Sequence, residues 1–211
     1  MWALVDDSNK ITNVYGEFPS RITINNRNYD KAELNAMSDS EKLAIKIYPV
    51  TAATKLDDKY YISNDPTYAV DGNKVVETIT KSADRKLADE DAKDEEGNQL
   101  LHDDGSKVIN YGLKTVAKNK ATTDADGFLK GFGWLIQRKV TADTAIPSDV
   151  LTYMAAIRKD CDDIKSAIDG ASDMDAFIAL HTDTYKGDGS IDVVARVNRW
   201  TSDKDVKQYR R

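Results

Sequence analysis

The feature that most constrains the fold is a regular row of apolar side chains in the C-terminal half of the chain. The row consists of Val150, Met154, Ile157, Cys161, Ile164 and Ile168. Successive steps of 4, 3, 4, 3 and 4 residues place all of them on one face of an α-helix. We predict that this helix has Ser148 as its N-cap and ends at Gly170. A helix with one continuous apolar face must bury that face against a partner.

Two kinds of partner are compatible with the row, because its length is close to the minimum for a coiled coil. In the first interpretation the helix packs inside its own domain, on a neighbouring helix and a strand at Trp134. In the second, two or more copies of the chain associate about a symmetry axis, with Met154, Cys161 and Ile168 along the seam. We predict a homo-oligomer, and the residues leave both arrangements open.

The sequence around this row favours further helices. A short helix over Asp173–His181, capped by Ser172, is expected to form a helical hairpin with the long helix across Asp169–Ala171. Lys114–Lys130 is compatible with a helix, whereas Trp134-Leu135-Ile136 is a short apolar run that we interpret as a strand.

The N-terminal part alternates apolar and polar residues over short runs, which is typical of β structure. Three hairpins are predicted: Ala3–Val5 with Ile11–Tyr15, Arg21–Ile24 with the segment around Tyr29, and Tyr68–Val70 with Lys74–Ile79. The last is expected to turn at Asp71-Gly72 in a type I′ turn. Ser38 and Glu41 have capping-box spacing and predict a short helix that reaches Ile47 and is stopped by Pro49.

Residues 81–107 are strongly acidic, with nine acids and five bases. We interpret them as an exposed connector, partly helical around Leu87, whose acids form a solvated face. A site for a metal or a basic partner is the alternative. The predicted fold class is therefore α+β, with a β-rich module carrying a short helix (1–80), an acidic connector (81–112), a helical module (113–195) and a basic tail (196–211).

Composition excludes several classes of function. The 36 acidic and 30 basic residues leave a net charge of −6, which argues against a nucleic-acid partner. One cysteine and two histidines are too few for a disulfide framework or a zinc cluster. No apolar stretch is long enough for a membrane span, and the first residues lack the pattern of a signal peptide. We expect no cofactor and no metal.

The candidate catalytic groups all have ordinary structural interpretations. The sequence contains no nucleophile elbow and no glycine-rich phosphate loop. We expect His102 on the surface, His181 at a helix end and Cys161 buried as a small hydrophobe. The acidic segments Asp124–Gly127 and Asp188-Gly189 lack the acids that an EF-hand requires and are interpreted as turns. We therefore predict that the chain is not an enzyme; a small wall hydrolase is the enzymatic alternative.

The helical half also carries a series of short motifs. In chain order they are Gly112-Leu113-Lys114-Thr115, a helix, Trp134-Leu135-Ile136-Gln137-Arg138-Lys139, Thr144-Ala145-Ile146-Pro147 and Ile157-Arg158. This order resembles the C-terminal module of small bacteriophage tail-fibre and tail-accessory virion proteins. The N-terminal strands and capped helix, with Trp2 and Tyr48-Pro49, are similar to the head module of that group.

The chain departs from the pattern of that group at three places. Gly133 replaces an aspartate, Thr141 or Ala142 a glutamate, and Met154 an arginine. The polar network of the motif is thereby reduced to Trp134, Arg138 and Arg158. The resemblance implies no catalytic residue.

The resemblance implies a structural virion protein, assembled in the bacterial cytoplasm, that joins or decorates a tail, baseplate or fibre. Its partners would be other tail or fibre proteins. A capsid or neck decoration protein and a non-virion chaperone for fibre assembly are the alternatives. The packing and interface residues that we select are Trp2, Trp134, Arg138, Arg158, the row from Val150 to Ile168, and Trp200 as an interface anchor.

The last segment, from Arg196, reverses the charge of the connector, with six bases and two acids. One hypothesis is that it docks on an acidic surface, such as residues 81–107 of another copy. The alternative is a solvated, partly ordered terminus.

Overall fold

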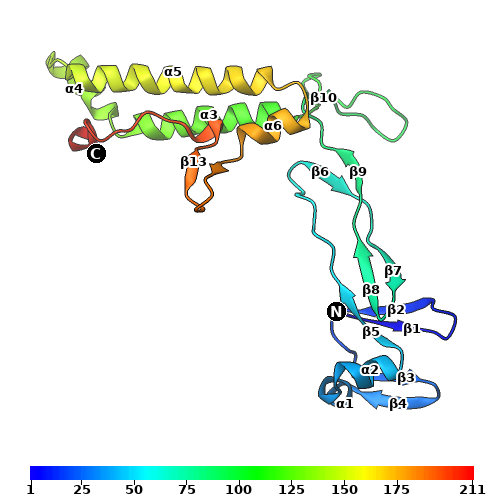
Figure 1. Cartoon of the computed structure of the whole chain (residues 1–211). Helices are drawn as coiled ribbons and strands as arrows, with labels where there is room; N and C mark the ends of the chain where they lie inside the picture. The colour runs from blue at the N-terminus through cyan, green and yellow to red at the C-terminus, as the bar shows by residue number, and fades with distance from the viewer. The chain divides into compact units, whose positions relative to one another are not determined.

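The computed structural model describes residues 1–211 and separates into two compact units, Met1–Asp84 and Arg85–Arg211 (Figure 1). Strands dominate the first unit and helices the second. The predicted α+β class, with a strand-rich N-terminal part and a helical C-terminal part, is confirmed. The boundary lies inside the predicted connector, so residues 81–84 belong to the first unit and the rest of the connector to the second.

The first unit is built on a five-stranded sheet. Its strands in spatial order are β2 (Ile11–Tyr15), β1 (Trp2–Val5), β5 (Ile47–Thr51), β8 (Lys74–Thr78) and β7 (Thr67–Asp71). The β5–β8 pair is parallel and the other pairs are antiparallel. Side chains from several of these strands bury a cluster around Ala3, Val5, Tyr48 and Val75.

Pro49 lies inside a strand, so the predicted helix to Ile47 with a stop at Pro49 is wrong. Helix α2 (Asp39–Ala44) ends earlier, and Lys46 has a positive φ of 63° that redirects the chain into β5. Ile47 to Pro49 pair with β1, whereas Val50 and Thr51 pair with β8. The strand changes partner next to Pro49, so the missing amide proton of the proline does not interrupt a continuous ladder.

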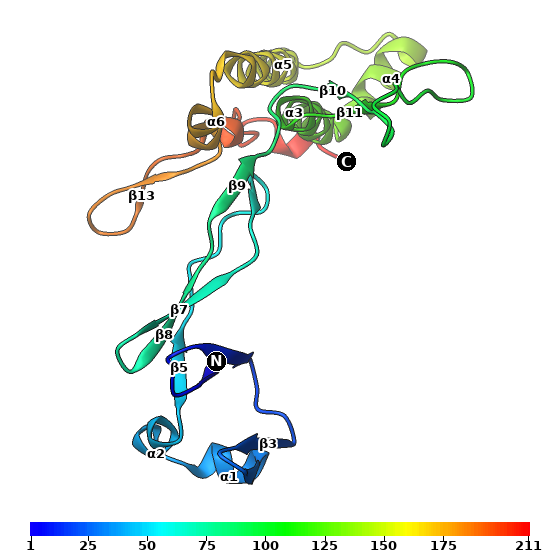
Figure 2. The same ribbon diagram turned by 90° about the vertical axis from the view of Figure 1, so that its right-hand side faces the viewer.

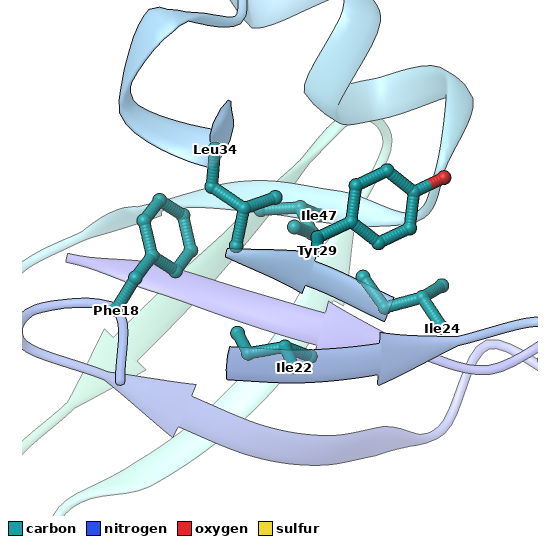
Figure 3. Close-up of a cluster of buried hydrophobic side chains, with 6 residues drawn as sticks. All are labelled: Phe18, Ile22, Ile24, Tyr29, Leu34 and Ile47. Atoms are coloured by element: carbon teal, nitrogen blue, oxygen red, sulfur yellow. The ribbon is translucent and has the colours of Figure 1, made fainter. Parts of the chain in front are cut away.

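The first unit also contains a second hairpin and two short helices. β3 (Arg21–Ile24) and β4 (Arg27–Asp30) are joined by Asn25 and Asn26, whose φ values of 48° and 61° fit a type I′ turn. Helix α1 (Lys31–Ala36) follows directly, and the predicted capping box of Ser38 and Glu41 is present at α2. These elements enclose the core shown in Figure 3, which consists of Phe18, Ile22, Ile24, Tyr29, Leu34 and Ile47.

The hairpin of β7 and β8 forms as predicted, but its turn differs by one residue. Asp71 pairs with Lys74, so the turn residues are Gly72 and Asn73. Only Gly72 has a positive φ, at 60°. One positive φ at the first turn position is the pattern of a type II′ turn, so the predicted type I′ turn at Asp71-Gly72 is wrong. A separate two-stranded sheet pairs β6 (Tyr61–Ser63) with β9 (Lys81–Asp84).

The acidic segment of the second unit forms β turns, and the helix predicted around Leu87 is absent. β10 (Glu90–Asp91) pairs with β11 (Ile109–Asn110), and the loop between them contains two further turns with positive φ at Gly97 and Gly105. Several acids have local partners there. Asp91 accepts a hydrogen bond from Lys107, and the carboxylates of Asp94 and Asp104 accept amide protons of their own turns.

Residues 86–89, which precede β10, accept hydrogen bonds from the first amides of helix α3 (Leu113–Lys130) and so cap its N-terminal end. The Asp89 carboxylate accepts the Gly112 amide proton at 2.8 Å, and the amides of Leu113 and Lys114 donate to the carbonyls of Lys86 and Leu87. A Cβ at position 112 would lie 2.4 Å from the Ala88 backbone. Glycine is therefore required at this crossing.

Two long antiparallel helices, α3 and α5, form the body of the second unit (Figure 1). Helix α5 (Ser148–Gly170) buries Val150, Met154, Ile157, Cys161, Ile164 and Ile168, each between 0% and 6% exposed. Ala121 and Ala125 on α3 are buried too, and the Cys161 thiol lies 3.6 Å from the Ala121 carbonyl oxygen. The row thus packs inside its own unit. The alternative that Met154, Cys161 and Ile168 form a seam between copies is wrong, because the isolated chain already covers them.

Several local predictions in this unit need correction. Trp134 lies in helix α4 (Gly133–Ala142) rather than in a strand, and Asp124–Gly127 lies within α3 rather than in a turn. The Ser148 side chain does not cap α5. Helix α6 (Met174–Leu180) is capped by Asp173, not by Ser172.

The remaining elements of the second unit are short. β12 (Thr184–Tyr185) and β13 (Ile191–Val193) form a hairpin that turns through Gly189, consistent with the turn predicted at Asp188-Gly189. Two 3-10 turns, η1 (Arg196–Asn198) and η2 (Lys207–Tyr209), lie in the C-terminal tail.

Candidate functional site

The C-terminal tail folds back over α3, α4 and α5 of its own unit. The Trp134 indole N–H donates to the Tyr209 carbonyl at 2.9 Å, and the Arg211 amide donates to the Gly131 carbonyl at 3.1 Å. Thr201 donates its amide and hydroxyl protons to the Asp160 carboxylate, both at 2.7 Å. These contacts contradict the alternative of a solvated tail.

Trp134 is the centre of a cation–π cluster at the end of this tail. The guanidinium carbons of Arg138 and Arg211 lie 5.0 and 3.9 Å from the centroid of its ring. The structure therefore brings two predicted site residues, Trp134 and Arg138, into contact. The buried Nε of Arg138 has no hydrogen-bond partner.

The tail and the start of α5 line an open surface depression of about 340 Å³, which we call the tail cavity. Six polar residues line it: Ser148, Asp149, Thr152, Thr201, Ser202 and Asp205. Tyr153 and Val206, both buried, complete its wall. The volume lies at the lower end of the roughly 300–1,000 Å³ that is usual for ligand pockets.

The carboxylates at and near the tail cavity differ in the hydrogen bonds and ion pairs that they make. Asp149 Oδ1 accepts the amide proton of Val150, at the N-terminal turn of α5. The Asp205 carboxylate makes no hydrogen bond or ion pair. Asp203, its neighbour in the tail, is paired with Arg210 at 2.7 Å. Neither Asp149 nor Asp205 is paired with a cation, and both side chains are exposed.

Tyr153 is one of the two buried side chains that line the tail cavity. It is 5% exposed, its ring lies 5.5 Å from that of Phe132, and its hydroxyl has no hydrogen-bond partner. Burial raises the pKa of Tyr153, and the charges of Asp203 and Asp160 raise the pKa further, while Arg210 opposes them. The phenol therefore stays protonated and lies in a negative local field.

The other predicted site residues lie apart from the cavity. Trp2 stacks on Phe18 in the first unit, with centroids 6.1 Å apart, and the Lys42 ammonium lies 4.6 Å from its ring centroid. Arg158 is exposed and donates to the Met154 carbonyl in its own helix; no hydrogen bond, ion pair or ring contact joins it to Trp134 or Arg138. The predicted three-residue network is thus reduced to one pair.

Trp200 and His181 each contact their own unit. The Trp200 ring lies 5.2 Å from that of Phe128, so this tryptophan covers α3. His181 Nδ1 lies 2.9 Å from the Phe177 carbonyl oxygen, which is the helix-end contact that the sequence predicts.

Sequence reasoning missed Tyr153, Asp205 and Val206. Tyr153 had a usable signal, because it follows Val150 by three residues and so lies beside the apolar row. Asp205 and Val206 had none, since their role depends on where the tail folds back.

Large apolar side chains are exposed at the β12–β13 hairpin. Tyr185, Ile191, Val193 and Val194 are between 41% and 63% exposed. The hairpin belongs to no larger sheet and projects from the helices of its unit in both views (Figures 1 and 2).

The structure gathers no group of three histidine, cysteine or carboxylate side chains suited to a metal ion. None of its helices combines the length and the apolar character needed to cross a bilayer. Comparison with models of protein families, with curated proteins and with solved structures gave no match.

Proposed function

We propose that this chain is a structural component of a bacteriophage tail, at the baseplate or at the attachment of a fibre. It acts through protein–protein contacts rather than catalysis, as a homo-oligomer in the virion, with other tail or fibre proteins as its partners. The resemblance of the motifs from Gly112 to Arg158 suggests the particle, and the surface of the second unit suggests the mode of action.

The observation that carries the proposal is the exposed apolar hairpin of β12 and β13. A hairpin of two short strands is marginally stable by itself, and contiguous exposed apolar side chains mark sites of protein contact. Tyr185, Ile191 and Val193 lie in these strands and Val194 follows them, so one short segment presents four such side chains. Contact with a neighbouring subunit would bury them and order the ribbon.

The test is the protein content of purified particles from cells that produce the chain during phage infection. We expect mass spectrometry to find the wild-type chain at a fixed ratio to the other tail proteins. The double substitution Ile191→Ser, Val193→Ser is expected to reduce its incorporation at least tenfold while leaving the helical circular dichroism unchanged. Both side chains are exposed in the free chain, so their replacement leaves the helical core intact.

The matched control is Val140→Ser on α4, a side chain that is 79% exposed and lies outside the hairpin. It is expected to leave incorporation unchanged. Absence of the wild-type chain from particles, with fibre assembly lost when the chain is deleted, would support the assembly chaperone instead. A fixed ratio to capsid or neck proteins would support decoration there, and lysis of cell walls in a zymogram would contradict a purely structural role.

A further inference from the structure

We propose that the C-terminal tail, residues 195–211, exchanges between two copies of the chain. In the exchanged dimer the tail of each copy binds the surface formed by α3, α4 and α5 of the other copy, which we call the tail-binding surface. The proposal rests on the homo-oligomer of the proposed function and names its interface. The tail and the tail-binding surface both belong to the second unit, Arg85–Arg211.

The partner that fits the tail-binding surface is known, because the chain's own tail occupies it. Trp200 packs on Phe128 of α3, and Thr201 donates two hydrogen bonds to the Asp160 carboxylate on α5. Val206, in the middle of the tail, is 2% exposed. A second copy offers the same tail to the same surface, so each of these contacts can form between chains as well as within one chain.

The far end of the tail is held by backbone groups. The Tyr209 carbonyl accepts the Trp134 indole proton on α4, and the Arg211 amide donates to the Gly131 carbonyl between α3 and α4. These contacts do not depend on which copy supplies the tail. The tail can therefore leave its own surface as one segment and make the same hydrogen bonds on another.

The β12–β13 hairpin connects the tail to α6, and few contacts hold it closed. Its strands share two residue pairs, and the Asp183 carboxylate accepts the Ala195 amide proton at 2.6 Å at its base. It belongs to no larger sheet and projects from the helices (Figure 2). An isolated two-stranded hairpin is marginally stable, so it is the segment that opens most readily into a linker between copies.

The apolar side chains of this hairpin favour the exchanged dimer. Tyr185, Ile191, Val193 and Val194 are 41% to 63% exposed in the isolated chain. In a symmetric exchanged dimer the two opened linkers cross near the twofold axis, where these side chains can cover one another. The contacts of the tail are the same in both states, so the apolar area buried between the linkers decides the balance.

A buried hydroxyl at the tail-binding surface makes release of the tail easier. Tyr153 lies where α5 meets the tail, because it lines the tail cavity together with Thr201 and Val206. Its hydroxyl is buried without a hydrogen-bond partner. Water can solvate this hydroxyl once the tail has left, so the docked state bears a penalty that the open state lacks.

The experiment detects a tail bound to another copy by disulfide formation. Two full-length variants, Asp160→Cys and Thr201→Cys, are each prepared with Cys161→Ala, mixed at high protein concentration and oxidised. Residues 160 and 201 are in contact, so a disulfide between the two variants requires the tail of one chain to lie on α5 of the other. We expect covalent heterodimers in which mass spectrometry identifies the link between positions 160 and 201.

The matched control replaces Asp160→Cys by Asp162→Cys in the same mixture. Asp162 is exposed on the same helix, and residues two apart do not share a helix face. We expect no heterodimer between Asp162→Cys and Thr201→Cys. Absence of heterodimers with Asp160→Cys, or an equal yield with Asp162→Cys, would overturn the proposal.

Further substitutions, added to both mixed variants, test the linker and the hydroxyl. Ile191→Ser with Val193→Ser removes apolar area from the linker and is expected to lower the heterodimer yield about threefold or more, whereas Val140→Ser leaves it unchanged. Tyr153→Phe is expected to slow heterodimer formation about threefold or more, because it stabilises the docked tail. An unchanged yield in the first case or an unchanged rate in the second would contradict the proposal.

These measurements fail independently of the virion role. A chain that is incorporated into particles but forms no heterodimer contradicts only the tail exchange. A chain that exchanges tails but is absent from particles contradicts only the virion role.

Discussion

The carboxylate of Asp173 holds the N-terminal turn of α6. Its Oδ1 accepts the amide proton of Ala176 at 2.9 Å, and its Oδ2 accepts the Ser172 hydroxyl proton at 2.9 Å. The hydrogen bond from Ala176, followed by that from Ser172, lowers the pKa of Asp173 below its ordinary value of 3.8. A carboxyl group whose pKa is lowered by folding stabilises the folded chain only in its charged form.

We expect this contribution to disappear in acid. It is fully present above the unfolded pKa near 3.8 and is lost as the pH falls through the lower folded value. Asp173→Asn keeps an acceptor oxygen but does not titrate. The Tm of the wild type should therefore exceed that of Asp173→Asn at neutral pH, and the difference should shrink below about pH 4.

Asp175→Asn is the control for this comparison, because Asp175 lies in the same turn without a side-chain hydrogen bond. The Tm difference between Asp175→Asn and the wild type should depend less on pH than the difference between Asp173→Asn and the wild type. A constant difference between wild type and Asp173→Asn across the acid range would contradict the assigned cap.

The candidate site was only partly predictable at the level of residues. Trp134 and Arg138 are four residues apart, so any helix through them brings them together, even though we predicted a strand. Arg158 was expected beside them and is exposed elsewhere on α5, because only tertiary packing decides which helix faces meet. Tyr153 and Asp205 come together for the same reason, through a tail whose course no local pattern encodes.

At the level of elements, α5 carries most of the apolar core of the second unit. Ile157 is fully buried near its middle, whereas Leu151 is 51% exposed on the same helix. We expect Ile157→Ala to lower the free energy of unfolding of the second unit by about 2–5 kcal/mol, because it leaves a cavity between α5 and its partners. Leu151→Ala should lower it by less than about 1 kcal/mol. Chemical denaturation followed by circular dichroism measures both, and equal effects would contradict the assigned buried face.

The elements that were predicted correctly have a local signal strong enough to specify them. The row from Val150 to Ile168 spans several helical turns, and the hairpins have turn residues such as Asn25-Asn26 and Gly72. The errors fall where the local signal is short. Three apolar residues at Trp134 fit a helix and a strand equally well. A proline ordinarily ends a helix or strand. Pro49 is accommodated in β5 because the strand changes its partner from β1 to β8 there, and this change depends on the tertiary arrangement of the sheet.

At the level of the whole molecule, each unit has its own core. The two apolar clusters of the first unit are made entirely of residues before Asp84, and the row on α5 is covered by residues after it. We expect fragments 1–84 and 85–211 to fold when expressed separately, each with a cooperative thermal transition. Dispersed ¹⁵N spectra would verify this, and a fragment that stays unfolded alone would contradict the division.

The capping of α3 by residues 86–89 has a consequence for engineering. The Asp89 carboxylate and the Lys86 and Leu87 carbonyls anchor one end of the loop to the start of α3, and Gly112 anchors the other. The ends of the segment between them are thus held together whatever its length. Because the entropic cost of closing a loop grows only slowly with loop length, lengthening this loop destabilises the folded chain little. The turn at Gly105 is therefore a suitable position for an inserted epitope or fluorescent label, with which the chain can be located inside a particle.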